Sequence, residues 1–168
     1  MKLSALSVRP APLPDLLPVL RASALACEAR GLPMWPQDSL TTERLSIQYP
    51  GAQGWLGTLD DQTVAAMLLV PKDPQFWPDD PPGEALYLHK LAVHPGRQGR
   101  GLSTSMIRAA VQATRAEGRP WLRLDTDAER PKLRSLYERQ GFLLVREGHL
   151  DGWPAAWYEL RVEERAGQ

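Results

Sequence analysis

The chain has 168 residues, a length that suits a single domain with a hydrophobic core. It carries 20 basic and 20 acidic residues, so its zero net charge indicates neither a nucleic-acid nor a membrane partner. No apolar run is long enough to span a bilayer, and Pro10, Pro12 and Pro14 interrupt the stretch where a signal peptide needs an apolar core. The single cysteine, Cys27, cannot form an internal disulfide, and we expect a cytoplasmic protein.

Hydrophobic spacing and turn residues predict five elements up to Val70. Proline lacks the N–H group that a helix interior needs, so Pro18 is expected in the first turn of its helix or just before it. In chain order, we expect a strand over Leu3–Val8, helices over Pro14–Arg30 and about Leu40–Tyr49, and strands over Gly54–Leu59 and Thr63–Val70.

A proline-rich loop over residues 71–85 follows. Phe76 and Trp77 indicate that this loop packs on the protein, although a disordered linker is the alternative. Gly152 and Pro154 are expected to interrupt the chain between the last two strands. The elements expected after the loop are a strand over Leu86–Val93, a helix from Leu102 to about Glu117, a strand over Trp121–Asp125, a helix over about Arg130–Gln140, and strands over Phe142–Val145 and Trp157–Val162.

A strand, a glycine-rich turn and a helix N-terminus adjoin one another around Gly99 and Gly101. The first N–H groups of a helix lack internal partners, the helix dipole favours negative charge there, and glycine allows a ligand to approach closely. The turn therefore predicts a phosphate-binding cradle, unless the glycines serve only packing. It lacks the Lys-Ser or Lys-Thr pair of a P-loop, and the third glycine of a dinucleotide fingerprint would fall at Thr104.

The pattern Gln98-x-x-Gly101-x-Ser103 resembles the Q/R-x-x-G-x-G/A signature of the GNAT superfamily of acyl-CoA N-acyltransferases, and Leu91-Ala92-Val93 is similar to that family's fourth strand. Ser103 stands in place of the usual glycine or alanine and is also small. The resemblance implies that the turn amides hold the pyrophosphate of acetyl-CoA and that the strand bonds its pantetheine arm. The cofactor-binding residues implied are Leu91, Ala92, Val93, Gln98, Gly99, Arg100, Gly101, Leu102, Ser103, Thr104 and Arg130.

The resemblance covers nearly the whole chain and implies an α/β (α+β) fold. We expect a mixed, curved sheet of about six to seven strands with helices on both faces, in which the fourth and fifth strands splay apart to admit the cofactor. Residues 1–168 would form one acetyl-CoA-dependent N-acetyltransferase domain, and a homodimer is possible because dimers are common in similar proteins. No spacing of His and Cys residues suggests a metal site.

Tyr137, which precedes Gly141-Phe142, looks like the second motif of the superfamily. In that family the tyrosine often gives its proton to the departing coenzyme A sulfur, so Tyr137 is the expected general acid. The alternative is an aromatic ring that packs on the sheet and bonds the cofactor or the backbone. Arg130 stands where the family often has an asparagine that contacts the pantetheine arm, and it could meet a cofactor phosphate instead.

His89 is the candidate general base. Period-two geometry would put it on one strand face with Leu91 and Val93, and histidine titrates near neutral pH. It could also be a hydrogen-bonded strand histidine, or contact only the substrate. Glu84 is another candidate base, and His94 is expected to shape the turn.

The acceptor is expected to be a primary amine of a small molecule, attacking directly in a ternary complex because no side chain stands out as an acyl carrier. Asp79 and Asp80 could attract such a cation or simply be solvated, and Trp35, Trp77 and Tyr87 could line a pocket or anchor the core. An acyl-CoA sensor without catalysis and an enzyme that acetylates protein N-termini or lysines remain alternatives. Three phrases look like a subgroup of bacterial acetyltransferases without assigned substrates, namely Asp73–Trp77, Tyr87–Val93 and Arg123–Asp125.

Overall fold

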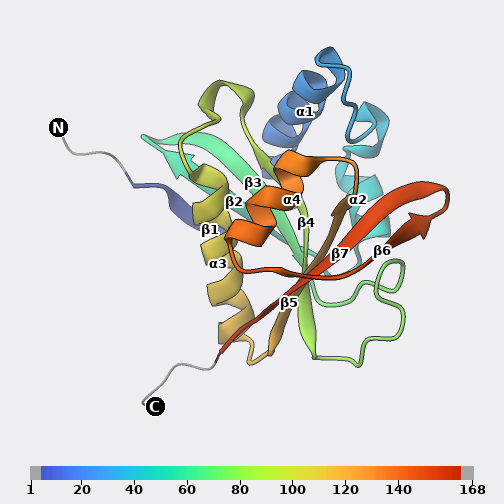
Figure 1. The fold of residues 1–168 in the computed structure, drawn as a ribbon. Coiled ribbons are helices and arrows are strands. Elements are labelled where there is room, and N and C mark those ends of the chain that lie inside the picture. The colour runs from blue at the N-terminus through green and yellow to red at the C-terminus, as the bar shows by residue number, and fades with distance from the viewer. Residues whose placement is uncertain (1–4, 164–168) are drawn as a thin grey trace. The chain divides into compact units, whose positions relative to one another are not determined.

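The structure is a computed structural model that describes residues 5–163, and its elements follow the order expected from the sequence (Figure 1). In chain order these are β1 (Ser7–Ala11), α1 (Leu13–Ala29), η1 (Gln37–Ser39), α2 (Thr42–Gln48), β2 (Gln53–Leu59), β3 (Gln62–Val70), β4 (Ala85–Val93), η2 (Pro95–Arg97), α3 (Leu102–Ala116), β5 (Trp121–Asp127), α4 (Pro131–Arg139), β6 (Leu143–Leu150) and β7 (Trp153–Arg161).

The strands form one mixed seven-stranded sheet in the order β1-β2-β3-β4-β5-β7-β6, which confirms the expected fold class. β4 and β5 are parallel, whereas the pairs β1–β2, β2–β3, β5–β7 and β6–β7 are antiparallel. The chain divides into two compact units, and β4 contributes residues to both. The first unit runs to Val70 and resumes at Lys90–Met106, and the second comprises Pro71–His89 and the chain from Ile107 onward.

In the first unit, helices cover both faces of β2. A Cβ at Gly54 would lie 2.9 Å from Leu16 of α1, whereas a Cβ at Gly57 would lie 3.0 Å from the sulfur of Met106 in α3. The two glycines are three residues apart in a strand, so they face opposite sides of the sheet. The expectation of helices on both faces is therefore confirmed where these two glycines let the helices approach closely.

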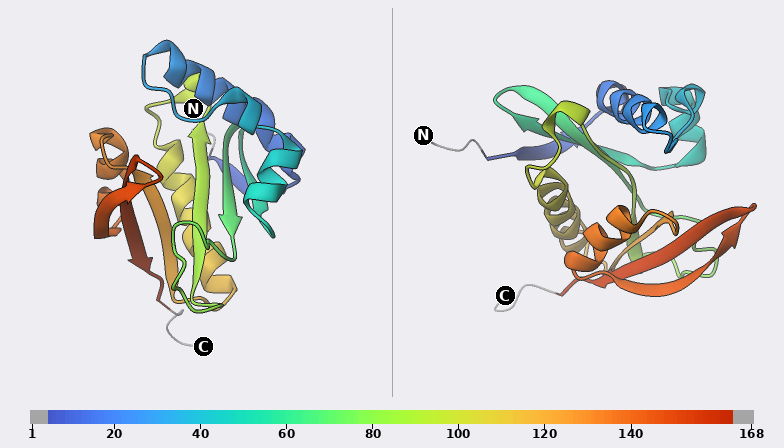
Figure 2. Two further views of the ribbon diagram at one scale, coloured as in Figure 1. Left: turned by 90° about the vertical axis from the view of Figure 1, so that its right-hand side faces the viewer. Right: turned by 45° about the horizontal axis from the view of Figure 1, so that its top comes forward.

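In the second unit, β6 and β7 form a single long hairpin (Figure 2). The sequence predicted both strands and an interruption at Gly152, which the structure confirms, but it made the strands too short, and Pro154 lies within β7 instead of interrupting the chain. Asp151 and Gly152 have φ values of 52° and 80° and make the tight turn, which is the two-residue connection that best matches strand twist. Pro154 lies near the start of β7 opposite His149, a strand position that tolerates the missing N–H.

Two positions in the N-terminal elements differ from the sequence prediction. The first strand begins at Ser7 instead of Leu3, and residues 1–4 lie outside the described part of the chain. Pro10 fits within this strand because β1 is at the sheet edge. Pro18 lies beyond the first turn of α1, where the helix continues although one N–H bond is missing.

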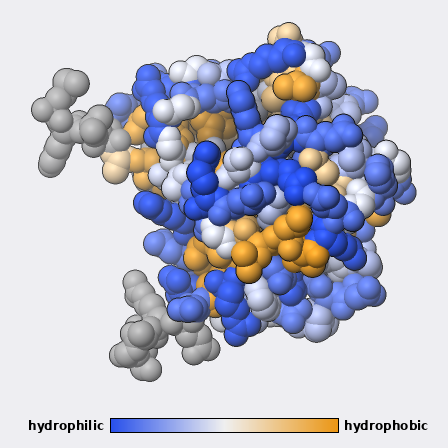
Figure 3. All heavy atoms as spheres, in the orientation of Figure 1, coloured by the Kyte–Doolittle hydropathy of each residue, from blue (hydrophilic) through white to orange (hydrophobic). Residues whose placement is uncertain are grey.

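The face shown in Figure 3 is mostly polar, with separate apolar areas. Among the exposed large apolar residues, Leu143, Leu144 and Val145 are consecutive on the edge strand β6. Within residues 5–163, none of the helices combines the length and the apolar character that crossing a membrane requires. Cys27 is half-buried in α1 and has a free thiol.

We expect Gly54→Ala to destabilise the fold by about 1–3 kcal/mol, because the added Cβ would lie 2.6 Å from the backbone oxygen of Ala11 and 2.9 Å from Leu16. Gly96→Ala is the matched control, since its Cβ would meet nothing closer than 3.5 Å and should change stability by less than about 0.5 kcal/mol. Urea unfolding of both variants measures the difference. Equal losses would contradict the close packing of β2.

Candidate active site

The glycine-rich turn has the backbone conformation that the cradle requires. Gly99 and Gly101 have φ values of 81° and 71°, a left-handed region that other residues rarely adopt. Nothing lies within 4 Å of the point where a Cβ would stand at either glycine. The first backbone bond of α3 runs from the Ser105 N–H to the Gly101 carbonyl, so the amides of the preceding turn lie at the positive end of the helix.

Side chains around the turn brace it against the rest of the first unit. His94 accepts a hydrogen bond at Nδ1 from the Gly96 N–H at 3.2 Å, as expected of a turn residue. Arg30 donates to the side-chain oxygen of Gln98 at 3.5 Å, and Arg97 donates to Gln62. Arg97 thus ties the turn to β3.

A left-handed residue interrupts β4 directly after His89. Lys90 has a φ of 54°, and its ammonium lies 4.8 Å from the ring centre of Trp35. Such a residue in a strand breaks the alternation of side chains, as a bulge does. The two-residue alternation of side chains therefore cannot be extended past His89. It does not place His89 on one face with Leu91 and Val93, contrary to the expectation from the sequence.

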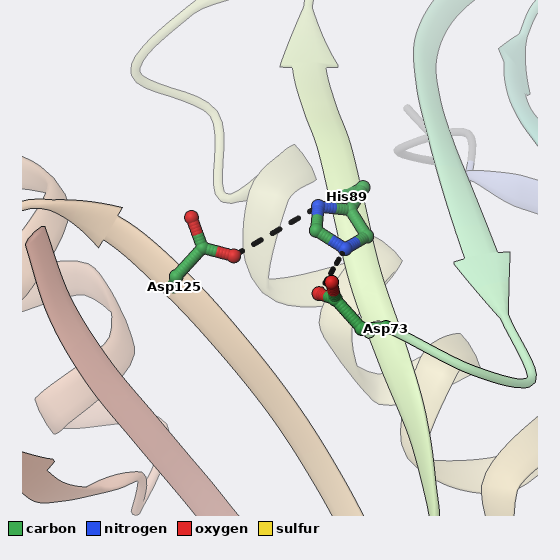
Figure 4. A group of neighbouring side chains, drawn as sticks. All are labelled: Asp73, His89 and Asp125. Atoms are coloured by element: carbon green, nitrogen blue, oxygen red, sulfur yellow. Dashed lines mark hydrogen bonds and ion pairs between the residues drawn. The ribbon is translucent and has the colours of Figure 1, made fainter. Parts of the chain in front are cut away.

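The His89 imidazole lies between two carboxylates of the second unit (Figure 4). Its Nε2 is 2.8 Å from Oδ2 of Asp73, which comes from the proline-rich loop, and its Nδ1 is 4.0 Å from Oδ1 of Asp125 on β5. All three side chains are 6–8% exposed. The first distance is a hydrogen bond, and the second exceeds hydrogen-bond range.

These residues also form a group of potential metal ligands that sequence spacing did not suggest. The geometry argues against a shared ion, because Asp73 and Asp125 face different nitrogens of the ring (Figure 4). An ion between Nδ1 and Asp125 would need bonds of about 2.0–2.2 Å, and the 4.0 Å separation would then open the angle at the ion to roughly 130–180°, wider than in a tetrahedral site. The row formed by Asp73, His89 and Asp125 fits hydrogen bonding and proton transfer better than metal binding.

Tyr137 of α4 is buried against aromatic neighbours. Its ring lies 5.7 Å from Phe142, edge to face, and 6.4 Å from Tyr158. Burial, and secondly the charge of Asp125, raise the pKa of the Tyr137 phenol well above its ordinary value of 10.0. The hydroxyl therefore stays protonated at neutral pH, and Asp125 acts on both candidate catalytic residues, His89 and Tyr137.

Of the remaining acidic candidates, Asp80 and Glu84 are engaged by Arg123 of β5, whereas Asp79 is exposed. Its guanidinium donates to Asp80 at 2.9 Å, to Glu84 at 2.7 Å and to Glu159 at 3.0 Å. Tyr87 donates its hydroxyl to Asp80 at 2.5 Å, and burial and this contact raise its pKa. Asp80 and Glu84 thus hold the loop to the sheet, which leaves little reason to assign them to the acceptor or to catalysis.

The other aromatic and basic candidates divide between the two units. Trp77 is buried and its ring lies 6.3 Å from Tyr87, which favours an anchoring role for both. Arg130 caps α4, and its Nε lies 3.4 Å from Asp127. Leu91, Ala92 and Val93 end β4 in the first unit, whereas His89 and Tyr137 belong to the second.

Sequence reasoning did not single out Asp73 and Asp125 for the site. The signal was present, because the three phrases that resemble a subgroup of acetyltransferases each contain one member of the row formed by Asp73, His89 and Asp125. What the phrases could not tell is that residues so far apart in the chain would meet at one imidazole.

Two curated proteins are similar to this chain in sequence. The uncharacterized N-acetyltransferase YesJ of Bacillus subtilis (strain 168) is 32% identical over 109 residues, which cover 62% of this chain and 57% of that protein. The mycothiol acetyltransferase of Beutenbergia cavernae is 38% identical over 130 residues, covering 72% of this chain and 40% of that protein. The chain thus spans only about half the length of the curated relatives it matches.

The fold is also that of a solved structure with bound cofactor. The Salmonella typhimurium protein yncA, solved with its cofactor acetyl-CoA, superposes with a TM-score of 0.67 at 15% identity, covering 97% of each chain. The family model of the acetyltransferase (GNAT) family matches residues 20–142. Since that match covers well over half of the sequence, the chain belongs to the acetyltransferase (GNAT) family.

Proposed function

We propose that this protein is an N-acetyltransferase that moves an acetyl group from acetyl-CoA to the primary amine of a small molecule. The observation that carries the proposal is the turn with left-handed Gly99 and Gly101 directly before α3, in a chain of this family. The names of the two curated relatives, both acetyltransferases, support the same reaction class.

The turn residues fit the cofactor on physical grounds. Open space at Gly99 and Gly101 lets phosphate oxygens approach the backbone, and the N-terminus of α3 provides amides and a positive dipole end. We assign pyrophosphate binding to residues 98–104 and pantetheine binding to the backbone of Leu91, Ala92 and Val93. Arg130 is assigned to a cofactor phosphate, although its Nε already lies 3.4 Å from Asp127.

The catalytic assignments follow the chemistry of acyl transfer. His89 would take a proton from the attacking amine, and backbone N–H groups near Leu91–Val93 would stabilise the oxyanion. Tyr137, held protonated by burial, would supply the proton for the departing thiolate. Attack is direct because Cys27, the only cysteine, is half-buried within α1 and lies outside this set of residues.

We expect Gly101→Glu to weaken acetyl-CoA binding by roughly 10- to 100-fold, because a carboxylate would stand at the proposed pyrophosphate site. Calorimetric titration with acetyl-CoA measures the loss. Gly118→Glu is the matched control, because Gly118 has a φ of 70°, close to the 71° of Gly101, and follows the other end of the same helix. Unchanged binding in Gly101→Glu, or equal losses in both variants, would contradict the cradle.

We expect Tyr137→Phe to lower kcat by roughly 10²- to 10⁴-fold while acetyl-CoA affinity is kept, because only the proton donor is removed. A thiol-release assay with an amine panel and a calorimetric titration separate the two effects. Tyr158→Phe is the control, since its buried hydroxyl bonds Glu138 at 2.7 Å and Arg134 at 2.9 Å and has no assigned role in the reaction. A wild-type rate in Tyr137→Phe would remove Tyr137 from the mechanism.

The raised pKa of Tyr137 also predicts how stability depends on pH. Below the unfolded-state pKa of about 10, the free energy of unfolding keeps its full contribution from Tyr137. This contribution is lost as pH rises toward the folded-state pKa, because between the two pKa values only the unfolded chain releases the phenol proton. Between about pH 10 and 12, Tyr137→Phe should lose about 1.4 kcal/mol less unfolding free energy per pH unit than the wild type. Urea unfolding across this range tests the difference, and parallel curves would show that the phenol is not held neutral.

A further inference from the structure

The carboxylate of Asp73 is fixed by two hydrogen bonds on its two oxygens. Oδ2 accepts from Nε2 of His89 at 2.8 Å, and Oδ1 accepts from the backbone N–H of Phe76 at 3.1 Å. The Phe76 carbonyl in turn accepts from the indole N–H of Trp157 at 2.8 Å, which ties this part of the loop to β7. Asp73 is therefore held in one orientation toward His89.

This contact determines which nitrogen of neutral His89 carries the proton. An ionised carboxylate can only accept hydrogen bonds, so the ring nitrogen that faces Asp73 must be the donor. Nε2 then carries the hydrogen, and the lone pair of the neutral ring is on Nδ1. Nδ1 is the nitrogen that faces Asp125, at 4.0 Å.

The spacing between Nδ1 and Asp125 suits an amine nitrogen that contacts both. With hydrogen bonds of about 2.8–3.0 Å to each atom, the angle at such a nitrogen would be roughly 85–90°, moderately below tetrahedral. Asp125 offers the negative charge that attracts an ammonium group, and Nδ1 offers the lone pair that can take its proton. The Phe76 ring, 6.5 Å from the imidazole, adds an apolar wall beside them.

We propose that His89 Nδ1 and Asp125 form the binding site for the acceptor's amino group, which makes the acceptor a cationic primary amine, and that Asp73 is the positioning residue that keeps the Nδ1 lone pair available. This inference rests on the proposed function and deepens it. The ammonium is bound by Asp125 and loses one proton to Nδ1, which leaves an imidazolium held by Asp73 and Asp125.

The acetyl step then balances. The freed nitrogen lone pair forms a bond to the thioester carbonyl carbon, and the carbon–sulfur bond breaks with its electron pair on sulfur. The attacking nitrogen releases a second proton to solvent, the sulfur takes a proton from Tyr137, and the resulting phenolate regains a proton from solvent. The proton on His89 passes to solvent, and no other reactant is required.

Asp73→Asn tests the positioning role directly. In this variant the side-chain oxygen must keep the Phe76 N–H, so the NH2 group faces Nε2 and the ring proton moves to Nδ1. Nitrogen-15 NMR of the histidine rings at about pH 8, where a free histidine is neutral, should show Nε2 protonated in the wild type and Nδ1 protonated in the variant. With the best acceptor from an amine screen, kcat should fall roughly 10²- to 10⁴-fold with little change in KM.

Asp125→Asn, with Asp61→Asn as its control, separates amine binding from histidine positioning. Asp125→Asn should raise the KM for the amine by roughly tenfold or more and leave the His89 tautomer unchanged. Asp61→Asn, at an exposed acid of the turn between β2 and β3, should change neither quantity. Methylammonium chloride should shift the Nδ1 signal of the wild type saturably but not that of Asp125→Asn, and tetramethylammonium, which has no N–H, should leave both unchanged.

Several outcomes would overturn the inference. A wild-type ring that carries its proton on Nδ1, or on both nitrogens at about pH 8, would remove the lone pair from the amine site. A methylammonium shift that survives Asp125→Asn would place the cation elsewhere. The NMR measurements need no turnover, so a protein that acetylates no amine would refute the proposed function while the tautomer and the cation site are still decided.

Discussion

The hydrogen bond from His89 to Asp73 is the contact on which the candidate site depends. It joins a loop without regular structure to β4 and fixes the ring that faces Asp125. Without it, rotation of the imidazole or exchange of its tautomer would leave no defined lone pair on that side. Because both side chains are almost fully buried, the bond is shielded from competing water and is expected to be stronger than an exposed one.

The same loop needs a second set of contacts, because one hydrogen bond does not order a proline-rich segment. Arg123 supplies them through ion pairs to Asp80 and Glu84, and its guanidinium also lies 5.2 Å from the ring centre of Trp77. If Arg123 lost these two acids, it would keep only Glu159 as an acid partner, so the network favours one arrangement of the loop. That arrangement is what brings Asp73 to His89.

Much of this could be predicted from the sequence. Apolar spacing located the helices, and the glycines before α3 identified the turn, because these signals are local. The full length of the β6–β7 hairpin was missed although Asp151-Gly152 is a favoured hairpin turn, since Pro154 was interpreted as part of the interruption. The row of Asp73, His89 and Asp125 could not be predicted, because it depends on pairing between strands and on the path of a long loop.

The position of Asp125 couples the two proton transfers in the proposed mechanism. Burial is the main cause of the raised pKa of Tyr137, and the negative charge of Asp125 adds to it. An ammonium bound at Asp125 brings a positive charge beside that carboxylate and offsets its effect, so the phenol becomes a better proton donor once the acceptor is present. Amine binding would thus offset only the second of the two causes that hold the proton on Tyr137, while burial, the larger cause, stays in place.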